Sequence, residues 1–335
     1  MKKVILLFVL SFLVIEISGY VLALLRIEPT GYRLFFNKEW LDPKNAYADR
    51  DTTVGVWHSP NDTWIQNGPC FTAEMKSNAF GARDNNWESG KDGYLFLGSS
   101  FIEGYGVNYN ERVSEHFEKL TGKEVFNCAM SGTFSPVQYY MTLVKFKNIL
   151  KFDTAVVFFV LPNDEQLVTK LEKKRYRPYL INDSIVYTRS SKLFPDRKDK
   201  KEKLQLFVLQ YSYVYHLFEY YKNRNMLKSR LMEDEKAEKK TRSYENLAKV
   251  MSKFCNDFPD KYFYFVLIPT LNDNSGAFPQ PVHSNMRILD LRNSLDNTTD
   301  YFNCNTHWNE GGHYRVANAL YKAMYPEKST VISCR

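Results

Sequence analysis

The chain has 335 residues, of which 44% are hydrophobic and 25% charged, so it is long enough to bury a large core and too apolar to be intrinsically disordered. Its net charge of +7 comes from basic residues that are mixed with acidic ones, without a basic face that would indicate nucleic-acid binding. The 5 cysteines are widely spaced and form no CxxC pair, so we expect no metal and no cofactor. An odd number leaves at least one free thiol, and the spacing does not show how the others pair.

The first predicted element is an apolar segment of about 22 residues, Val4 to Leu25, which is long enough to cross a hydrocarbon core of roughly 30 Å as a helix. Glu16 lies inside it and costs about 3 kcal/mol at a helix centre. Some sixteen Leu, Ile, Val and Phe residues outweigh this cost, because each contributes roughly 0.3 to 0.6 kcal/mol in favour of insertion. We therefore expect one transmembrane helix.

Lys2 and Lys3 precede this segment, so the positive-inside rule places the amino terminus in the cytoplasm and everything after Arg26 outside the cell membrane. We expect residues 1–26 to form an uncleaved signal-anchor. The alternative is a cleaved signal peptide with a weak cleavage site at Val21-Leu22-Ala23, although the apolar segment exceeds the usual length of about 7 to 15 residues.

Residues 27–92 show no sustained periodicity, and we expect a loop-rich lead-in that packs on the following domain. From residue 93 onward, predicted strands alternate with predicted helices. The strands are expected at 94–98, 124–127, 154–160 and 262–268, and the helices at 110–122, at 135–150 and after Asn309. This alternation predicts an α/β domain over 93–335, a three-layer flavodoxin-like parallel sheet that is preceded by the transmembrane helix.

The alternation breaks between about residues 165 and 260, where we expect a helical insertion. It begins with a predicted hairpin over 179–187 that turns at Asn182-Asp183, followed by a charged segment over 196–203. Residues 204–254 contain no glycine or proline and have a helical composition. This insertion could be a lid, or its helices could simply cover one face of the sheet.

Loops with chemically useful residues follow the predicted strands, where ligands bind in open α/β sheets. Ser100 lies on a glycine-flanked turn after the first strand, Gly132 follows the second, and Asn163 follows the third. His307 comes two residues after Asn305, just before the last helix. A serine hydroxyl is a weak nucleophile without an adjacent base, and acyl chemistry also needs donors that hold the oxyanion.

The order and spacing of these motifs resemble the four blocks of the SGNH (GDSL-like) hydrolase superfamily over about residues 93–324. The segment Ser77-Asn-Ala-Phe-Gly-Ala-Arg83 is similar to the lead-in of membrane-anchored bacterial members, some of them related to alginate-type O-acetyltransferases. The resemblance implies that Ser100 is the nucleophile and His307 its base. It further implies an oxyanion hole made by the backbone N–H groups of Ser100 and Gly132 and the side chain of Asn163.

Two positions depart from the pattern of this superfamily. Ser99 stands where an aspartate usually precedes the nucleophile, and Asn305 stands where an acid usually orients the histidine. An amide at that position can favour the wrong imidazole tautomer, and in a serine protease this change lowers kcat by about 10⁴. Asn can still orient a histidine, whereas the spacing of Asp300 and Glu310 does not match the superfamily.

These features favour a serine-dependent esterase or O-acyltransferase whose partners are the membrane and an acylated, for example acetylated, envelope or secreted glycan or a small acyl ester. The alternative is an inactive SGNH-like component that binds glycans or helps an assembly. The aromatic residues of Tyr211–Tyr221 could stack on sugars, although at this spacing they more often pack a helix. An anchored domain of unrelated function is the third interpretation, since fold alone does not determine function.

Overall fold

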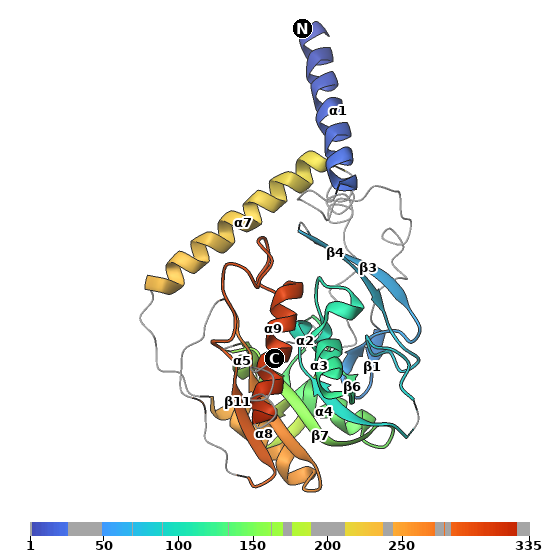
Figure 1. Cartoon of the computed structure of the whole chain (residues 1–335), viewed down its shortest axis with the longest axis vertical. Coiled ribbons are helices and arrows are strands. Elements are labelled where there is room, and N and C mark those ends of the chain that lie inside the picture. Colours follow the sequence, from blue (N-terminus) through green and yellow to red (C-terminus); the bar gives the residue numbers. More distant parts are fainter. Residues whose placement is uncertain are drawn as a thin grey trace, which may run out of the picture.

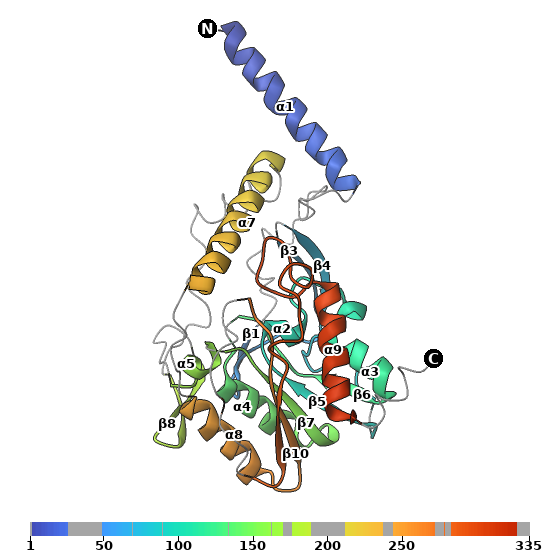
Figure 2. The same cartoon turned by 60° about the vertical axis from the view of Figure 1, so that its left-hand side comes forward.

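The computed structural model describes residues 2–25, 49–68, 70–88, 90–132, 134–161, 163–169, 176–188, 212–236, 244–271, 278 and 283–326. Helix α1 (Lys2–Leu24) projects away from an α/β body, as Figures 1 and 2 show. By length and composition α1 can cross a membrane, a property that a signal sequence would share. The predicted segment is therefore a single apolar helix that extends beyond the globular part.

Five parallel strands form the central sheet in the order β11-β10-β7-β5-β6. They are β5 (Asp92–Leu97), β6 (Glu124–Asn127), β7 (Lys151–Phe159), β10 (Tyr262–Leu267) and β11 (Met286–Asp290). Numbered by their sequence within the sheet and read from β6, they follow the order 2-1-3-4-5 of flavodoxin-like folds. The predicted fold class is confirmed, and β11 is an additional strand that the sequence analysis missed.

Helices cover both faces of this sheet and give three layers. Side chains of α3 (Val113–Thr121) and α9 (Glu310–Met324) share one buried cluster with the sheet, and those of α4 (Pro136–Phe146) and α8 (Glu245–Asp257) share the other. Neighbouring residues of one strand enter opposite clusters, for example Phe158 and Phe159 of β7. Both faces of its second half, Ala155–Phe159, are thus buried, which explains why that part of the strand is apolar without a break.

Local capping sets the helix ends. Ser135 accepts a hydrogen bond from the Gln138 N–H group at 3.4 Å, and Pro136 occupies the first position of α4. Gly122 ends α3 with a φ of 69°, and Asn309 caps α9. Helix α3 starts three residues later than predicted, because Asn110 lies in the short 3₁₀ turn η2 (Tyr109–Glu111) instead.

The described part of the lead-in contains two antiparallel pairs that the sequence analysis did not predict. Strands β1 (Asp49–Asp51) and β2 (Gly55–Trp57) form one pair, and β3 (Thr63–Gly68) and β4 (Phe71–Lys76) form the other. In β4, buried and exposed residues alternate over its whole length. Val54, Trp57 and Ala82 belong to the same core cluster as the sheet, so this region packs on the domain.

Between β7 and β10, no described residue adds a strand to the central sheet. The predicted hairpin is present as β8 (Pro178–Ile181) and β9 (Ser184–Tyr187), and its turn residues Asn182 and Asp183 have the positive φ angles, 49° and 61°, of a type I′ turn. Helix α8 covers the sheet, whereas α7 (Tyr213–Lys236) extends from α1 along the side of the body (Figures 1 and 2). The charged segment 196–203 lies outside the described residues, and the domain limits stay a prediction.

Candidate active site

Ser100 lies at the sharp turn that follows β5. It is the first residue of α2 (Ser100–Glu103), a single helical turn that ends at Gly104 with a φ of 90°. The turn requires Gly98, because a Cβ atom there would lie 2.7 Å from Ile102 Cγ1. Strand β5 lies between β6 and β7, so the loops that follow these three strands meet at one edge of the sheet.

Ser100, His307 and Asn305 form a continuous hydrogen-bonded chain. The Ser100 Oγ atom lies 2.7 Å from His307 Nε2, and Asn305 Oδ1 lies 2.6 Å from His307 Nδ1. Asn305 Oδ1 also accepts the backbone N–H of His307 at 3.1 Å. Since this amide oxygen is an acceptor, the proton of a neutral imidazole belongs on Nδ1, and Nε2 is left to accept the Ser100 hydroxyl. Asn305 therefore presents the tautomer that a general base needs.

Two aromatic rings enclose the imidazole of His307. The rings of Phe101 and Tyr105 stack against it, with centroids 4.6 Å and 4.4 Å from its own. Burial in this apolar environment lowers the pKa of His307 to about 4. His307 is therefore neutral at physiological pH and available to accept a proton. The sequence analysis missed both rings, although each follows Ser100 within one helical turn or slightly more.

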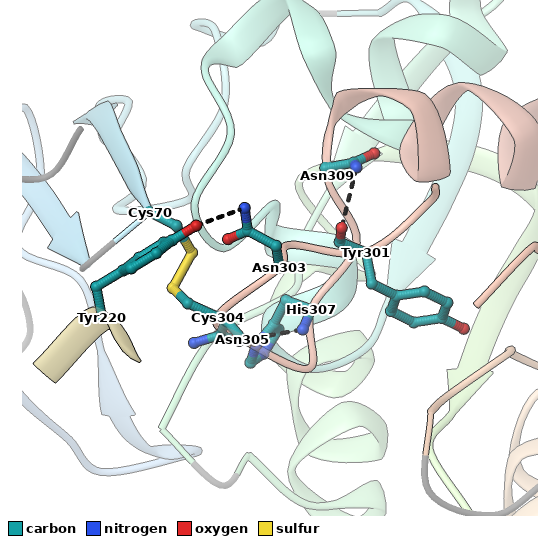
Figure 3. The surroundings of a disulfide bond; sticks show 8 residues. All are labelled: Cys70, Tyr220, Tyr301, Asn303, Cys304, Asn305, His307 and Asn309. Carbon is teal, nitrogen blue, oxygen red and sulfur yellow. Dashed lines mark hydrogen bonds between the residues drawn. A yellow bond between two sulfur atoms is a disulfide. The ribbon is translucent and has the colours of Figure 1, made fainter. Parts of the chain in front are cut away.

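The loop that carries Asn305 and His307 is fastened to the lead-in by a disulfide bond between Cys70 and Cys304. Figure 3 shows this bond beside Asn305, with Tyr220 of α7 packed next to the disulfide. The Asn303 side-chain amide donates to the Tyr220 hydroxyl at 3.0 Å. Spacing could not identify this pair of cysteines, because their sequence separation is 234. Cys128 and Cys255 are buried free thiols.

The loop closes on itself as well. Phe302 N–H donates to the His307 carbonyl at 3.0 Å. The Asn309 side-chain amide donates to the Thr299 carbonyl at 2.8 Å and to the Tyr301 carbonyl at 3.1 Å, the second of which is drawn in Figure 3. Trp308 is fully buried and donates its indole N–H to the Pro269 carbonyl at 3.0 Å. The imidazole of His307 is thus positioned by contacts on both sides of it in the sequence.

Gly132 and Asn163, the other members of the implied oxyanion hole, lie on the two loops that flank Ser100. Gly132 follows β6 and has a φ of 87°, and Asn163 begins α5 (Asn163–Thr169), where it is exposed. The Ser131 hydroxyl, next to Gly132, donates to the buried carboxylate of Glu103, which also contacts His58 Nε2 at 2.5 Å. This network fixes the Gly132 loop to α2, and the role of both residues in binding an oxyanion stays a prediction.

Ser99, at the position of the usual aspartate, has a different set of contacts. Its side chain lies close to Tyr139, whose hydroxyl donates to the Asp164 carboxyl at 3.2 Å. Burial raises the pKa of Asp164 to about 8. The loops after β5 and β7 are therefore linked through one buried tyrosine, which no spacing argument revealed.

The acids considered as substitutes for Asn305 lie elsewhere. Asp300 pairs with Arg315 at 3.2 Å and accepts the Asp296 N–H at 2.8 Å. Glu310 is the first residue of α9. Asn305 itself occupies the Nδ1 side of His307.

The segment Ser77–Arg83 packs against the turn after Ser100 and hydrogen-bonds to its backbone. Asn78 Oδ1 accepts the N–H groups of Phe80 and Ala82 at 2.9 and 3.0 Å, which folds the segment into a compact loop. Arg83, 1% exposed, then donates to the backbone carbonyls at the end of α2 and beyond, namely those of Glu103, Gly104 and Val107 at 2.7, 2.6 and 2.6 Å. The lead-in motif thus serves to hold the Ser100 turn.

No protein-family model and no curated protein matches the sequence. Among solved structures, the chain is similar to a "putative platelet activating factor" from Streptococcus pneumoniae at 10% identity and a TM-score of 0.34, over 70% of this chain and 85% of that chain. It is also similar to a carbohydrate esterase family 2 enzyme with a carbohydrate-binding domain from Corynascus thermopiles (Myceliophthora fergusii), at 11% identity and a TM-score of 0.36, over 72% and 68%. Similarities this remote do not indicate an activity, so the activity has to be inferred from the geometry of the site.

Proposed function

We propose that the protein is a serine-dependent esterase or O-acyltransferase. The observation that carries the proposal is the chain from the Ser100 hydroxyl through His307 to the Asn305 amide oxygen, at 2.7 and 2.6 Å. A hydroxyl at this distance from an unprotonated imidazole nitrogen has the base that it needs for attack on a carbonyl.

In the proposed reaction, Ser100 Oγ attacks the acyl carbonyl carbon and its proton moves to His307 Nε2. The negative oxygen of the tetrahedral intermediate accepts hydrogen bonds from the N–H groups of Ser100 and Gly132 and from Asn163. The ester C–O bond then breaks, and the leaving alcohol takes the proton from Nε2. Water or a second hydroxyl next attacks the acyl-serine, and this choice distinguishes hydrolysis from transfer.

The Asn305 amide makes this proposed chemistry slow rather than impossible. It holds His307 in the required tautomer, but it carries no charge to stabilise the imidazolium that forms during attack. The rings of Phe101 and Tyr105 also stack on the imidazole, and this apolar environment disfavours its charged form.

We place the proposed activity outside the cell membrane, on acyl groups such as acetyl of an envelope or secreted glycan. The Cys70–Cys304 disulfide supports this location, because such bonds persist in oxidising compartments. The orientation expected from Lys2 and Lys3 agrees with it.

The second candidate function is an inactive glycan-binding or assembly component. The substitution of Asn305 for the usual acid favours it, because that acid is the group that stabilises the charged base.

A fluorophosphonate probe tests the proposed nucleophile. We expect slow labelling of the folded protein at Ser100, complete loss of labelling in Ser100→Ala, and no change in Ser229→Ala, whose serine lies on the exposed side of α7. Circular dichroism would show that all three proteins fold alike. If neither the wild type nor Asn305→Asp is labelled, the proposed enzymatic activity is contradicted. The inactive glycan-binding or assembly component is then the remaining candidate function.

A further inference from the structure

Helix α7 begins on the apolar helix α1. The carboxylate of Glu16 accepts hydrogen bonds from the Ser212 hydroxyl at 2.7 Å and from the backbone N–H groups of Tyr213 and Val214 at 2.6 and 3.3 Å. These donors belong to the first turn of α7, whose N–H groups have no partner within the helix. Glu16 therefore caps α7, and its negative charge lies at the positive end of that helix.

A second contact fixes the same joint. The ring of Tyr213 lies over Gly19, where a Cβ atom would be only 1.9 Å from Tyr213 Cγ. Gly19 is buried, although most of α1 is exposed. Glu16 and Gly19 are three residues apart and thus on the same side of α1, so both select the same position for α7.

The joint lies well inside the apolar segment. Glu16 precedes Leu25 by nine residues, which is about 13 Å along a helix. If α1 spans a bilayer, the first turn of α7 reaches the outer leaflet, and its N–H groups satisfy a carboxylate that is costly in hydrocarbon. The unfavourable residue of the predicted transmembrane helix thus has a specific partner in the folded domain.

The two sides of α7 differ. Tyr220 is buried beside the Cys70–Cys304 disulfide, whereas Phe218 and Tyr221 are 60% and 51% exposed. Phe218 and Tyr221 are three residues apart and share one face, in the first half of α7, whose start joins α1. Exposed aromatic rings beside an apolar helix are the feature that membrane interfaces favour.

We propose that α7 is a membrane-surface helix, joined to α1 through Glu16 and Gly19 and contacting the outer lipid leaflet through Phe218 and Tyr221. The lipid bilayer is the partner because these exposed rings lie in the first half of a helix that starts on α1, whose apolar side chains are themselves largely exposed. Helix α1 is then a retained part of the protein and not a discarded leader. Since Tyr220 bonds to Asn303, α7 also holds the His307 loop near the membrane surface. The proposal does not depend on the reaction at Ser100.

Depth-dependent fluorescence quenching of the full chain in lipid nanodiscs tests the proposal. An environment-sensitive nitrobenzoxadiazole label is attached at Phe218→Cys, in a Cys334→Ser background, with Cys128 and Cys255 protected by burial. The matched control is Ile149→Cys, which is 51% exposed but lies next to the start of β7. We expect lipids with a spin label near the headgroup to quench the label at 218 several-fold more than the label at 149.

Two variants of α1 test the joint. Glu16→Leu removes the acceptor and Gly19→Leu displaces Tyr213, so each should reduce the quenching at 218 to the level at 149, while α1 still resists carbonate extraction. Glu16→Gln keeps one acceptor oxygen, so the quenching at 218 should fall less than in the leucine variants. Equal quenching at 218 and 149 in the parent protein would overturn the proposal. Exclusion of aqueous iodide from 218 without lipid quenching would overturn it too, because protein would then cover the face. Unchanged quenching at 218 in both leucine variants would show that Glu16 and Gly19 do not hold α7 at the membrane.

Discussion

The residues around His307 lower the pKa of its imidazole, and this effect can be measured in the pH dependence of labelling at Ser100. Burial lowers its pKa to about 4, and only the neutral imidazole above that pKa can take the Ser100 proton. We therefore expect the rate of fluorophosphonate labelling to stay constant from neutral pH down to about 5 and to fall as the pH drops through about 4. A fall that begins near pH 6.5, the ordinary value for histidine, would contradict the protected environment.

Asn305→Asp should change this profile in two ways. A carboxylate beside Nδ1 stabilises the imidazolium, so the pKa of His307 rises and the acid limb of the profile moves to higher pH. The plateau rate should also rise at least about tenfold, within the limit of about 10⁴ that a carboxylate supplies in serine proteases. Asn297→Asp, which places a charge on an exposed residue eight positions before Asn305, serves as control and should leave the plateau nearly unchanged.

Motif order alone was enough to pair Ser100 with His307 across 207 positions, because parallel strands bring their carboxyl ends to one edge. The side chains that surround this pair could not be predicted from the sequence. Phe101 and Tyr105 resemble ordinary core residues until the loop of His307 folds between them, and the contact of Ser99 with Tyr139 depends on how two loops meet.

At the level of elements, the disulfide controls the loop that carries the base. We expect the Cys70→Ser/Cys304→Ser double variant to lose about 2 to 5 kcal/mol of unfolding free energy in urea denaturation. Its labelling at Ser100 should slow as well, because the His307 loop is no longer tied to the lead-in. Reductant should produce the same effects in the wild type and none in the variant. Equal stability of the two oxidised proteins would count against a structural role for the bond.

The start of α9 is the other support of this loop. Asn309 caps the helix through Gly312 N–H at 3.0 Å, and its amide also holds two carbonyls of the loop. Asn309→Ala should therefore lower stability by about 1 to 2 kcal/mol and slow labelling. Asn318→Ala, on the exposed side of the same helix, is the matched control and should change stability by less than about 0.5 kcal/mol. Similar losses in the two variants would show that the cap has no special importance.

Long apolar strands and the Asn182-Asp183 turn were predictable because their signals are local. Strand β11 was not, since Met286–Asp290 is a short edge strand that contains the exposed polar residues Arg287 and Asp290. The pairs β1–β2 and β3–β4 were hidden among turn-forming residues, although the alternation in β4 was a usable signal. Such short strands depend on partners from elsewhere in the chain more than on their own sequence.

At the scale of the whole molecule, we predict that α1 remains attached to the domain in the mature protein. We expect the mature protein to keep its first residues, to resist carbonate extraction, and to expose the domain after residue 26 to an externally added protease. Amino-terminal sequencing of the membrane fraction measures the first property directly. Recovery of a soluble form that begins near Leu24 would instead show a cleaved signal peptide.

Arg83 determines how far the domain can be shortened. Its guanidinium supplies hydrogen bonds to three buried carbonyls after α2, and each would cost roughly 1 to 3 kcal/mol if left without a donor. A truncated protein that begins at β5 would retain every strand of the central sheet and still lose these donors. A shortened form that keeps these bonds should therefore start before Arg83, so one side chain ahead of the sheet sets the minimal folding unit.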